Sequence, residues 1–208
     1  MSRRKRTPRS VPDHYSRRAR AENYPARSVY KLEEIQKRHR VIKPGDAVLD
    51  LGCYPGSWLL FVSGLVGRRG KVVGIDKKPV TKPMPPNVTA LEGDVNTADR
   101  DFLLEILGRA DVVISDMAPD TTGNKFTDAA RSFHLAVAAF NLAVAVLKPG
   151  GNFVCKLFSG EDFKNFTDMV KKNFSRCKVF KPESCRSESR ETYVIGFSKK
   201  ENTNVGSQ

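Results

Sequence analysis

Two lysines and two carboxylates stand inside or beside apolar segments of this sequence. Lys156 interrupts the apolar segment Asn152–Phe158, and burying an ammonium group there is costly unless it is paired or loses its proton. Asp116 directly follows an apolar segment, and Glu191 directly precedes another. Lys31 lies in a helix-like segment near the amino end. Taken singly, Lys31 and Glu191 are typical of solvated surface groups, so their interest depends on where the fold brings them.

A second set of carboxylates falls at or near the carboxyl ends of predicted strands: Asp50, Asp76, Asp94 and Asp116. In an open α/β sheet a nucleotide-like ligand binds at this edge, and a carboxylate there accepts hydrogen bonds from ribose hydroxyls. We expect Asp76 in that role, the Glu92–Asp94 segment near an adenine amino group, and Asp50 near a positive charge. One aspartate at a strand end is most often a turn residue, but four at one edge predict a cationic, ribose-bearing ligand.

The first strand-to-helix turn, Gly52–Ser57, differs from the fingerprint of dinucleotide-binding proteins. Its glycines, Gly52 and Gly56, are four residues apart, and Tyr54 stands where a central glycine would let the backbone approach a pyrophosphate. A nucleoside ligand without phosphates is therefore favoured over a dinucleotide.

Strands and helices alternate regularly after an amphipathic helix at Arg27–Arg40. The predicted strands are Ala47–Leu51, Lys71–Ile75, Val88–Glu92, Asp111–Ser115, Asn152–Leu157, Lys178–Phe180 and Thr192–Ser198. The predicted helices between them are Ser57–Val66, Thr97–Leu107, Thr127–Leu147 and Glu161–Asn173. This order is typical of a Rossmann-like α/β fold, with a seven-stranded, mostly parallel sheet and helices on both faces. Only a short link joins the last two strands, so the terminal strand is expected to be antiparallel.

Basic residues gather at the amino end of the chain. Lys and Arg together number 36 against 23 for Asp and Glu, a net charge of +13, and the first 40 residues contain 13 basic and four acidic side chains. Such an excess predicts a polyanionic partner such as RNA. We expect a basic, partly disordered arm at residues 1–25, one folded domain at residues 26–198 and a polar tail at residues 199–208.

Other composition signals indicate a cytoplasmic protein without a metal. The sequence has no run of 18 apolar residues, and its amino end is charged where a signal peptide would be apolar. The four cysteines form no CxxC pair, and the three histidines are widely separated, so we expect free thiols and no metal site. A monomer is expected, without membrane contact.

Short segments along residues 13–198 resemble the FtsJ/RrmJ (RlmE) family of ribosomal RNA 2′-O-ribose methyltransferases. The matching segments are Asp13–Tyr15, Ala26–Leu32, Asp50–Gly52, Pro55–Trp58, Ser115–Pro119, Lys148–Gly151, Lys156–Phe158 and Ser189–Tyr193. The resemblance implies S-adenosyl-L-methionine as cofactor, held by Gly56, Trp58, Asp76, Asp94 and Asp116. It also implies a catalytic set made of Lys31, Asp116, Lys156 and Glu191. One departure is visible, because the usual Ala-Ala-Pro-Gly-Gly turn here reads Cys-Tyr-Pro-Gly-Ser at 53–57.

The resemblance further implies methylation of a ribose 2′-hydroxyl, on a uridine of large-subunit (23S) ribosomal RNA in the assembled 50S particle. We expect Lys156 to act as general base, Asp116 to orient Lys156 and the donor, and Glu191 to position a lysine. Lys31 is expected to hold the acceptor ribose or its phosphate. Because a carboxylate favours the charged ammonium, a second role stays open, in which Lys156 only steers the hydroxyl group.

Three other functions fit parts of the sequence. A nicotinamide-dependent oxidoreductase could use the same sheet, although Tyr54 argues against it. A non-catalytic RNA-binding ribosome assembly factor could keep this fold, although all four charged residues of the catalytic set are present. Methylation of transfer RNA or of an mRNA cap at a 2′-hydroxyl is the nearest alternative, because it uses the same chemistry.

Overall fold

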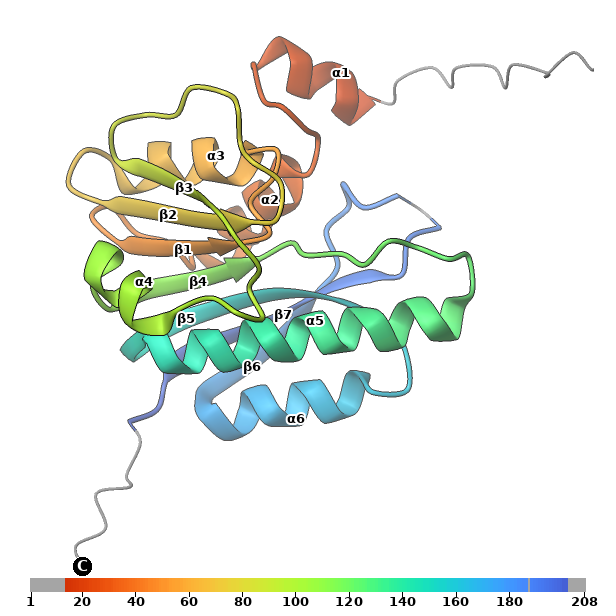
Figure 1. Cartoon of the computed structure of the whole chain (residues 1–208). Helices are drawn as coiled ribbons and strands as arrows, with labels where there is room; N and C mark the ends of the chain where they lie inside the picture. Colours follow the sequence, from red (N-terminus) through yellow and green to blue (C-terminus); the bar gives the residue numbers. More distant parts are fainter. Residues whose placement is uncertain (1–13, 187, 202–208) are drawn as a thin grey trace, which may run out of the picture.

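The computed structural model describes residues 14–186 and 188–201, and within them one sheet is flanked by helices (Figure 1). Its strands are β1 (Ala47–Leu51), β2 (Lys71–Asp76), β3 (Val88–Glu92), β4 (Ala110–Ser115), β5 (Leu147–Phe158), β6 (Phe174–Phe180) and β7 (Glu191–Lys199). Its helices are α1 (His14–Ala21), α2 (Val29–His39), α3 (Ser57–Val66), α4 (Arg100–Leu107), α5 (Lys125–Val146) and α6 (Phe163–Asn173). The first 13 residues of the predicted arm, and most of the predicted tail, lie outside the described residues.

The sheet has seven strands in the order β3-β2-β1-β4-β5-β7-β6. The neighbours from β3 to β5 pair in parallel. β7 lies between β5 and β6 and runs antiparallel to both. The predicted fold class, a mostly parallel seven-stranded sheet with a terminal antiparallel strand, is therefore confirmed.

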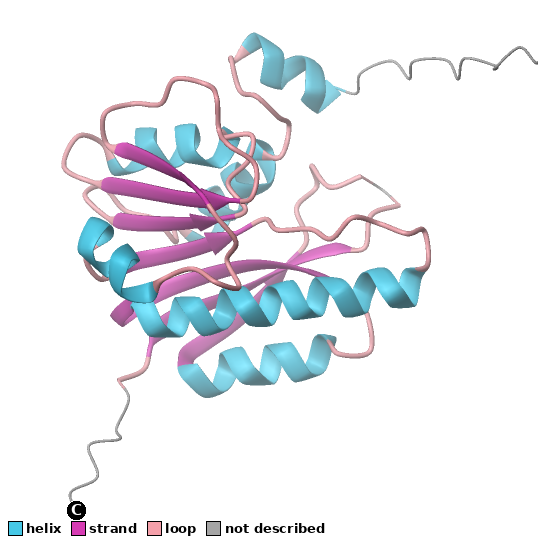
Figure 2. Cartoon of the chain, in the orientation of Figure 1, coloured by secondary structure: helices cyan, strands magenta, loops and turns pink. Residues whose placement is uncertain are grey.

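Each face of the sheet is covered by its own group of helices. Leu49 of β1 packs in an apolar cluster with α4, α5 and α6, whereas its neighbour Val48 packs in a second cluster with α2 and α3. Figure 2 shows this arrangement, with α5 and α6 lying along one face of the strands. Successive residues of a strand point to opposite faces, so a strand covered on both sides becomes a continuous apolar run, as the sequence showed.

α5 is the one helix, within the part of the chain that the structure describes, whose length and apolar composition suit a membrane span. Its residues Ala136, Ala139, Phe140 and Ala143 are instead buried in the apolar cluster on the sheet. The ring of Phe140 packs edge-on against that of Phe153 in β5, with 6.0 Å between their centroids. α5 is therefore a core helix of this fold.

One helix starts later than predicted because a side chain caps its backbone. The carboxylate of Asp99 accepts hydrogen bonds from the backbone N–H groups of Asp101 and Phe102. Such a cap ends the extended chain and begins the helix. α4 therefore begins at Arg100 and not at the predicted Thr97.

Two elements extend the predicted set. α1 was not predicted and lies inside the segment expected to be a basic arm. Its residue Ala19 packs with Tyr30 of α2, and the guanidinium carbon of Arg18 lies 4.2 Å from the centroid of the Tyr30 ring. β6 begins at Phe174, four residues before the predicted Lys178. The basic side chains of α1 are thus attached to the folded domain.

Gly74, in the middle of β2, leaves no room for a side chain. A Cβ atom at this position would lie 2.7 Å from Cδ2 of Leu59 and 2.8 Å from Cβ of Cys53. We expect Gly74→Ala to lower the free energy of unfolding by about 1–3 kcal/mol, measured by urea denaturation. Gly64→Ala in α3 is the matched control, because nothing lies within 4 Å of the added methyl group. That control should gain about 0.5–1 kcal/mol, and equal stability of Gly74→Ala and the parent chain would contradict this packing.

Candidate active site

Lys31, Asp116, Lys156 and Glu191 lie far apart in the sequence and meet at the carboxyl edge of the sheet. Nζ of Lys156 lies 3.0 Å from Oδ1 of Asp116 and also donates a hydrogen bond to the main-chain carbonyl of Asp116. Nζ of Lys31 lies 2.6 Å from Oε2 of Glu191 and 3.9 Å from Oδ1 of Asp116. We refer to these four residues as the charged cluster. The structure thus brings together all four residues of the predicted catalytic set.

β5 and β7 position one side of the charged cluster through their pairing. Phe158 stands opposite Glu191 in the register, and Lys156 stands opposite Tyr193. The hydroxyl group of Tyr193 donates a hydrogen bond to Oδ1 of Asp116 at 2.6 Å. Tyr193 was not among the predicted site residues. It could have been predicted from its position two residues after Glu191, because residues two apart on a strand share a face.

α2 positions Lys31 from the other side. Leu32 and Ile35 on this helix are fully buried, and Nε1 of Trp58 donates a hydrogen bond to the carbonyl of Ser28 at 2.9 Å. Trp58 itself is only 3% exposed. In this structure Trp58 therefore fixes the start of the helix that carries Lys31, and its contact with a methyl donor stays a prediction.

Burial and the neighbouring charges shift the pKa values of Asp116 and Lys31 in opposite directions. Burial raises the pKa of Asp116, but the positive charges of Lys156 and Lys31 outweigh it and hold that pKa below its usual value. Burial lowers the pKa of Lys31, but the negative charges of Asp116 and Glu191 outweigh it and raise that pKa. Near neutral pH Asp116 is therefore a carboxylate and Lys31 an ammonium.

The segment 182–186 forms a wall of the site and is tied to α2. The carboxylate of Glu34 accepts hydrogen bonds from the backbone N–H groups of Glu183 and Ser184, at 2.7 and 2.9 Å. Sγ of Cys185 lies 3.7 Å from Oε2 of Glu191, and burial raises the pKa of this thiol to about 11. The thiol therefore stays protonated near neutral pH and donates a hydrogen bond to the same Glu191 oxygen that pairs with Lys31.

A cleft of about 630 Å³ opens beside Asp116 at the carboxyl ends of the strands. Its lining includes Gly52, Tyr54, Asp76, Asp94, Asp116 and Met117. The carboxylate of Asp76 accepts hydrogen bonds from the backbone N–H groups of Tyr54 and Lys78, which leaves lone pairs for ribose hydroxyls. The cleft has the size of a small-ligand site. The predicted residues Asp76, Asp94 and Asp116 share it, whereas Gly56 and Trp58 are not in its lining.

Asp50, near the end of β1, is fully buried, and neither carboxyl oxygen has a hydrogen-bond partner among the described residues. Burial raises the pKa of Asp50 well above its usual value, and the charges of Asp116 and Asp76 raise it further. An unpaired buried carboxyl group beside two carboxylates is costly, and a cationic ligand relieves that cost. These residues therefore fit the sulfonium-bearing donor that the sequence predicted.

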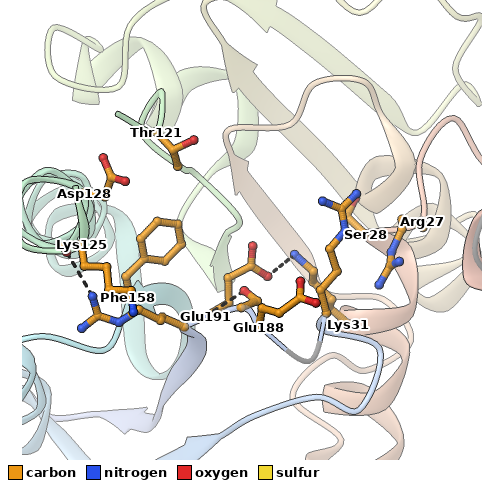
Figure 3. A pocket seen from close by; sticks show the side chains of 12 residues that line it. Arg27, Ser28, Lys31, Thr121, Lys125, Asp128, Phe158, Glu188 and Glu191 are labelled. Carbon is orange, nitrogen blue, oxygen red and sulfur yellow. Dashed lines mark hydrogen bonds and ion pairs between the residues drawn. The ribbon is translucent and has the colours of Figure 1, made fainter. Parts of the chain in front are cut away.

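A second cavity, of about 530 Å³, lies against Lys31 and Glu191 (Figure 3). We refer to it as the acceptor cavity, and its lining residues are Arg27, Ser28, Lys31, Thr121, Lys125, Asp128, Phe158, Arg186, Glu188, Ser189, Arg190 and Glu191. In Figure 3 the ion pair of Lys31 and Glu191 stands on one side, and Lys125 and Phe158 stand on the other. Five lining residues are cationic and three are anionic, so the cavity suits a negatively charged substrate. Because Asp116 lines the cleft, the charged cluster lies where the two spaces meet.

Comparison with known proteins agrees with this geometry. The model of the FtsJ-like methyltransferase family matches residues 24–199. Ribosomal RNA large subunit methyltransferase E of Desulfosudis oleivorans is 66% identical over 199 residues, which cover 96% of this chain and 96% of that protein. The protein of the same name from Desulforapulum autotrophicum is 57% identical over 189 residues, covering 90% of this chain and 93% of its own.

Solved structures show the same fold. A crystal structure from Plasmodium falciparum, titled as a ribosomal RNA methyltransferase, has a TM-score of 0.76 and 30% identity, and covers 85% of this chain and 98% of its own. Fibrillarin from Aeropyrum pernix, solved with S-adenosyl-L-methionine bound, has a TM-score of 0.61 and 16% identity. It covers 81% of this chain and 76% of its own, and indicates the fold alone. The chain therefore belongs to the FtsJ-like methyltransferase family, whose methyl donor is S-adenosylmethionine.

Proposed function

We propose that this protein methylates a ribose 2′-hydroxyl of large-subunit ribosomal RNA, on a uridine of the 23S molecule in the assembled 50S particle. The observation that carries the proposal is the charged cluster, which lies between a carboxylate-lined cleft and a cation-rich cavity. The relatives with 66% and 57% identity, both named for the large ribosomal subunit, support the choice of RNA. We further propose that the protein acts as a monomer and that it acts in the cytoplasm, on ribosomal RNA.

S-adenosylmethionine, when bound, supplies an activated methyl group on a positively charged sulfur. The chain has to align the 2′-oxygen with that carbon and to take up the hydroxyl proton. Alignment of two reactants can contribute roughly 7–11 kcal/mol to lowering the barrier. In our proposal Asp76, Asp94 and Asp116, which line the cleft, hold the donor, and the acceptor cavity holds the target nucleotide.

Each residue of the charged cluster has its own role in the remaining steps. We infer that Lys156 first releases a proton to the solvent, that its neutral Nζ then accepts the hydroxyl proton, and that Asp116, 3.0 Å away, orients Lys156. Glu191 holds Lys31 through its 2.6 Å ion pair, and Lys31 contacts the acceptor ribose or its phosphate from the cavity wall. Tyr193 fixes the carboxylate of Asp116 from the side away from the solvent, since its ring is fully buried.

The direct test is methylation of large ribosomal subunits isolated from cells that lack this enzyme. The purified chain and labelled donor should transfer one methyl group to one 2′-hydroxyl, located by mass mapping of the 23S RNA. Transfer RNA and capped mRNA are the comparison substrates. Labelling of either one in preference to the subunit would reject the proposed substrate.

The role of Lys156 is tested by Lys156→Arg, because a guanidinium keeps its charge and cannot accept the proton. We expect kcat to fall by at least about 10²-fold with donor binding unchanged. Lys199→Arg is the matched control, because Lys199 is also buried and its Nζ donates to the carbonyls of Val144 and Leu147, far from the charged cluster. Substantial turnover by Lys156→Arg would leave only the steering role for this lysine.

A basic face beside α2 supports a long RNA substrate. Arg38, Arg176 and Lys178 are exposed. Burial is the largest cause that lowers the pKa of His39, and the positive charges of these three residues lower it further. All three therefore lie near the His39 ring. The guanidinium carbon of Arg176 lies 4.2 Å from the centroid of the Phe197 ring. RNA phosphates are natural counter-ions for such a face.

The basic face leads to a prediction about salt dependence. Arg38→Gln, Arg176→Gln and Lys178→Gln in one chain should reduce the slope of log affinity against log salt by roughly 2–3, measured with undermethylated subunits. Arg68→Gln, Arg69→Gln and Arg109→Gln form the matched control. These exposed arginines precede β2 and β4, which β5 and β7 separate from β6 in the sheet, and they are not among the charges around His39, so the slope should not change. Equal slopes for both triple variants would exclude the basic face from the RNA contact.

A further inference from the structure

A third cavity, of about 630 Å³, lies next to the acceptor cavity. It is formed between the first turns of α5 and the segment 160–163, which follows β5. It shares Lys125, Phe158 and Arg190 with the acceptor cavity. We refer to it as the flanking cavity. The charged cluster contributes no residue to its lining, so the proposed chemistry does not account for it.

The flanking cavity is rich in aromatic side chains. Phe126, Phe133 and Phe163 line it together with Phe158. Phe126 is 75% exposed, more than any other large hydrophobic residue in the described part of the chain. The side chain of Asn124 accepts hydrogen bonds from the backbone N–H groups of Phe126 and Thr127. This cap fixes the first turn of α5, which carries Phe126.

Arg190 stands between the two cavities and is held rigidly there. Its guanidinium donates hydrogen bonds to the carbonyl of Lys125, at 3.1 Å, and to the carbonyl of Ser159. A guanidinium has five N–H donors, so donors remain for an anion. Lys125 adds a second positive charge at the same border. If one nucleotide occupied each cavity, the phosphate that links them would lie beside Lys125 and Arg190, whose positive charges would pair with it.

The flanking cavity also has two anionic lining residues, Glu161 and Asp162. Carboxylates repel a phosphate but accept hydrogen bonds from the amino and imino groups of a nucleobase. The cavity thus offers cations, aromatic rings and hydrogen-bond acceptors, which match the phosphate, the face and the edge of the base in a nucleotide.

We propose that the flanking cavity binds the nucleotide next to the methylated one, with its base stacked on Phe126 and its linking phosphate at Arg190. This inference rests on the proposed function, because it takes the acceptor cavity as the place of the target nucleotide. A target nucleotide that leaves its stack deprives its neighbour of a stacking partner. The exposed ring of Phe126 replaces that partner, and it is indifferent to base identity because every base has a π-face.

Phe126→Ala should lower kcat/KM on undermethylated subunits by about fivefold to a hundredfold, through KM and with kcat little changed. Phe126→Trp and Phe126→Tyr should keep the parent value because they keep an aromatic ring, whereas Phe126→Leu should behave like Phe126→Ala. Phe102→Ala is the matched control, because Phe102 is also exposed, at 48%, but lies on α4. Full activity of Phe126→Leu would mean that Phe126 contributes only hydrophobic contact and no stacking on a base. That result would overturn the proposal.

A second measurement does not depend on methylation. A short single-stranded RNA that carries 2-aminopurine is titrated with the full chain, and stacking on an aromatic ring should quench its fluorescence. The quenching should be lost in Phe126→Ala and kept in Phe102→Ala. Absence of quenching with the parent chain, or equal quenching in both variants, would also overturn the inference. If the parent chain quenches but does not methylate subunits, the proposed function fails and the stacking site stands.

Discussion

The carboxylate of Asp116 joins three parts of the fold that are distant in sequence. Its Oδ1 lies 2.6 Å from the hydroxyl of Tyr193, 3.0 Å from Nζ of Lys156 and 3.9 Å from Nζ of Lys31. Burial alone favours the neutral form of this group, and the two lysines reverse that preference. Asp116 and Glu191 in turn keep Lys31 charged. The charge of each group thus depends on its neighbours, so the site exists only when α2, β5 and β7 are all in place.

The two sides of Asp116 differ in charge, and this difference separates the two reactants. On one side are the carboxylates of Asp76, Asp94 and Asp120, which line the cleft. On the other side cations outnumber anions. In the proposed function the positively charged donor lies on the first side and the negatively charged RNA on the second. The reacting atoms can meet only at the border between them.

The order and type of nearly all helices and strands could be predicted from the periodicity of apolar residues, because a strand covered on both faces leaves a clear signal. Element ends were less predictable, since they depend on single side chains such as the cap at Asp99. The four members of the charged cluster came from motif resemblance, because no local pattern records which distant charges will meet. Tyr193 and the supporting role of Trp58 depend on three-dimensional contacts, which the linear order of residues does not contain.

Because β7 lies between β5 and β6, the charged cluster is completed only late in the synthesis of the chain. Glu191 and Tyr193 belong to the strand that the ribosome synthesises after all the others in the described sheet. Until that strand leaves the exit tunnel and enters the gap, Lys31 has no ion pair with Glu191 and Asp116 lacks its tyrosine. The residues that line the cleft, all within 52–138, are synthesised early, whereas Glu191 and Tyr193 reach the charged cluster only near the end of translation.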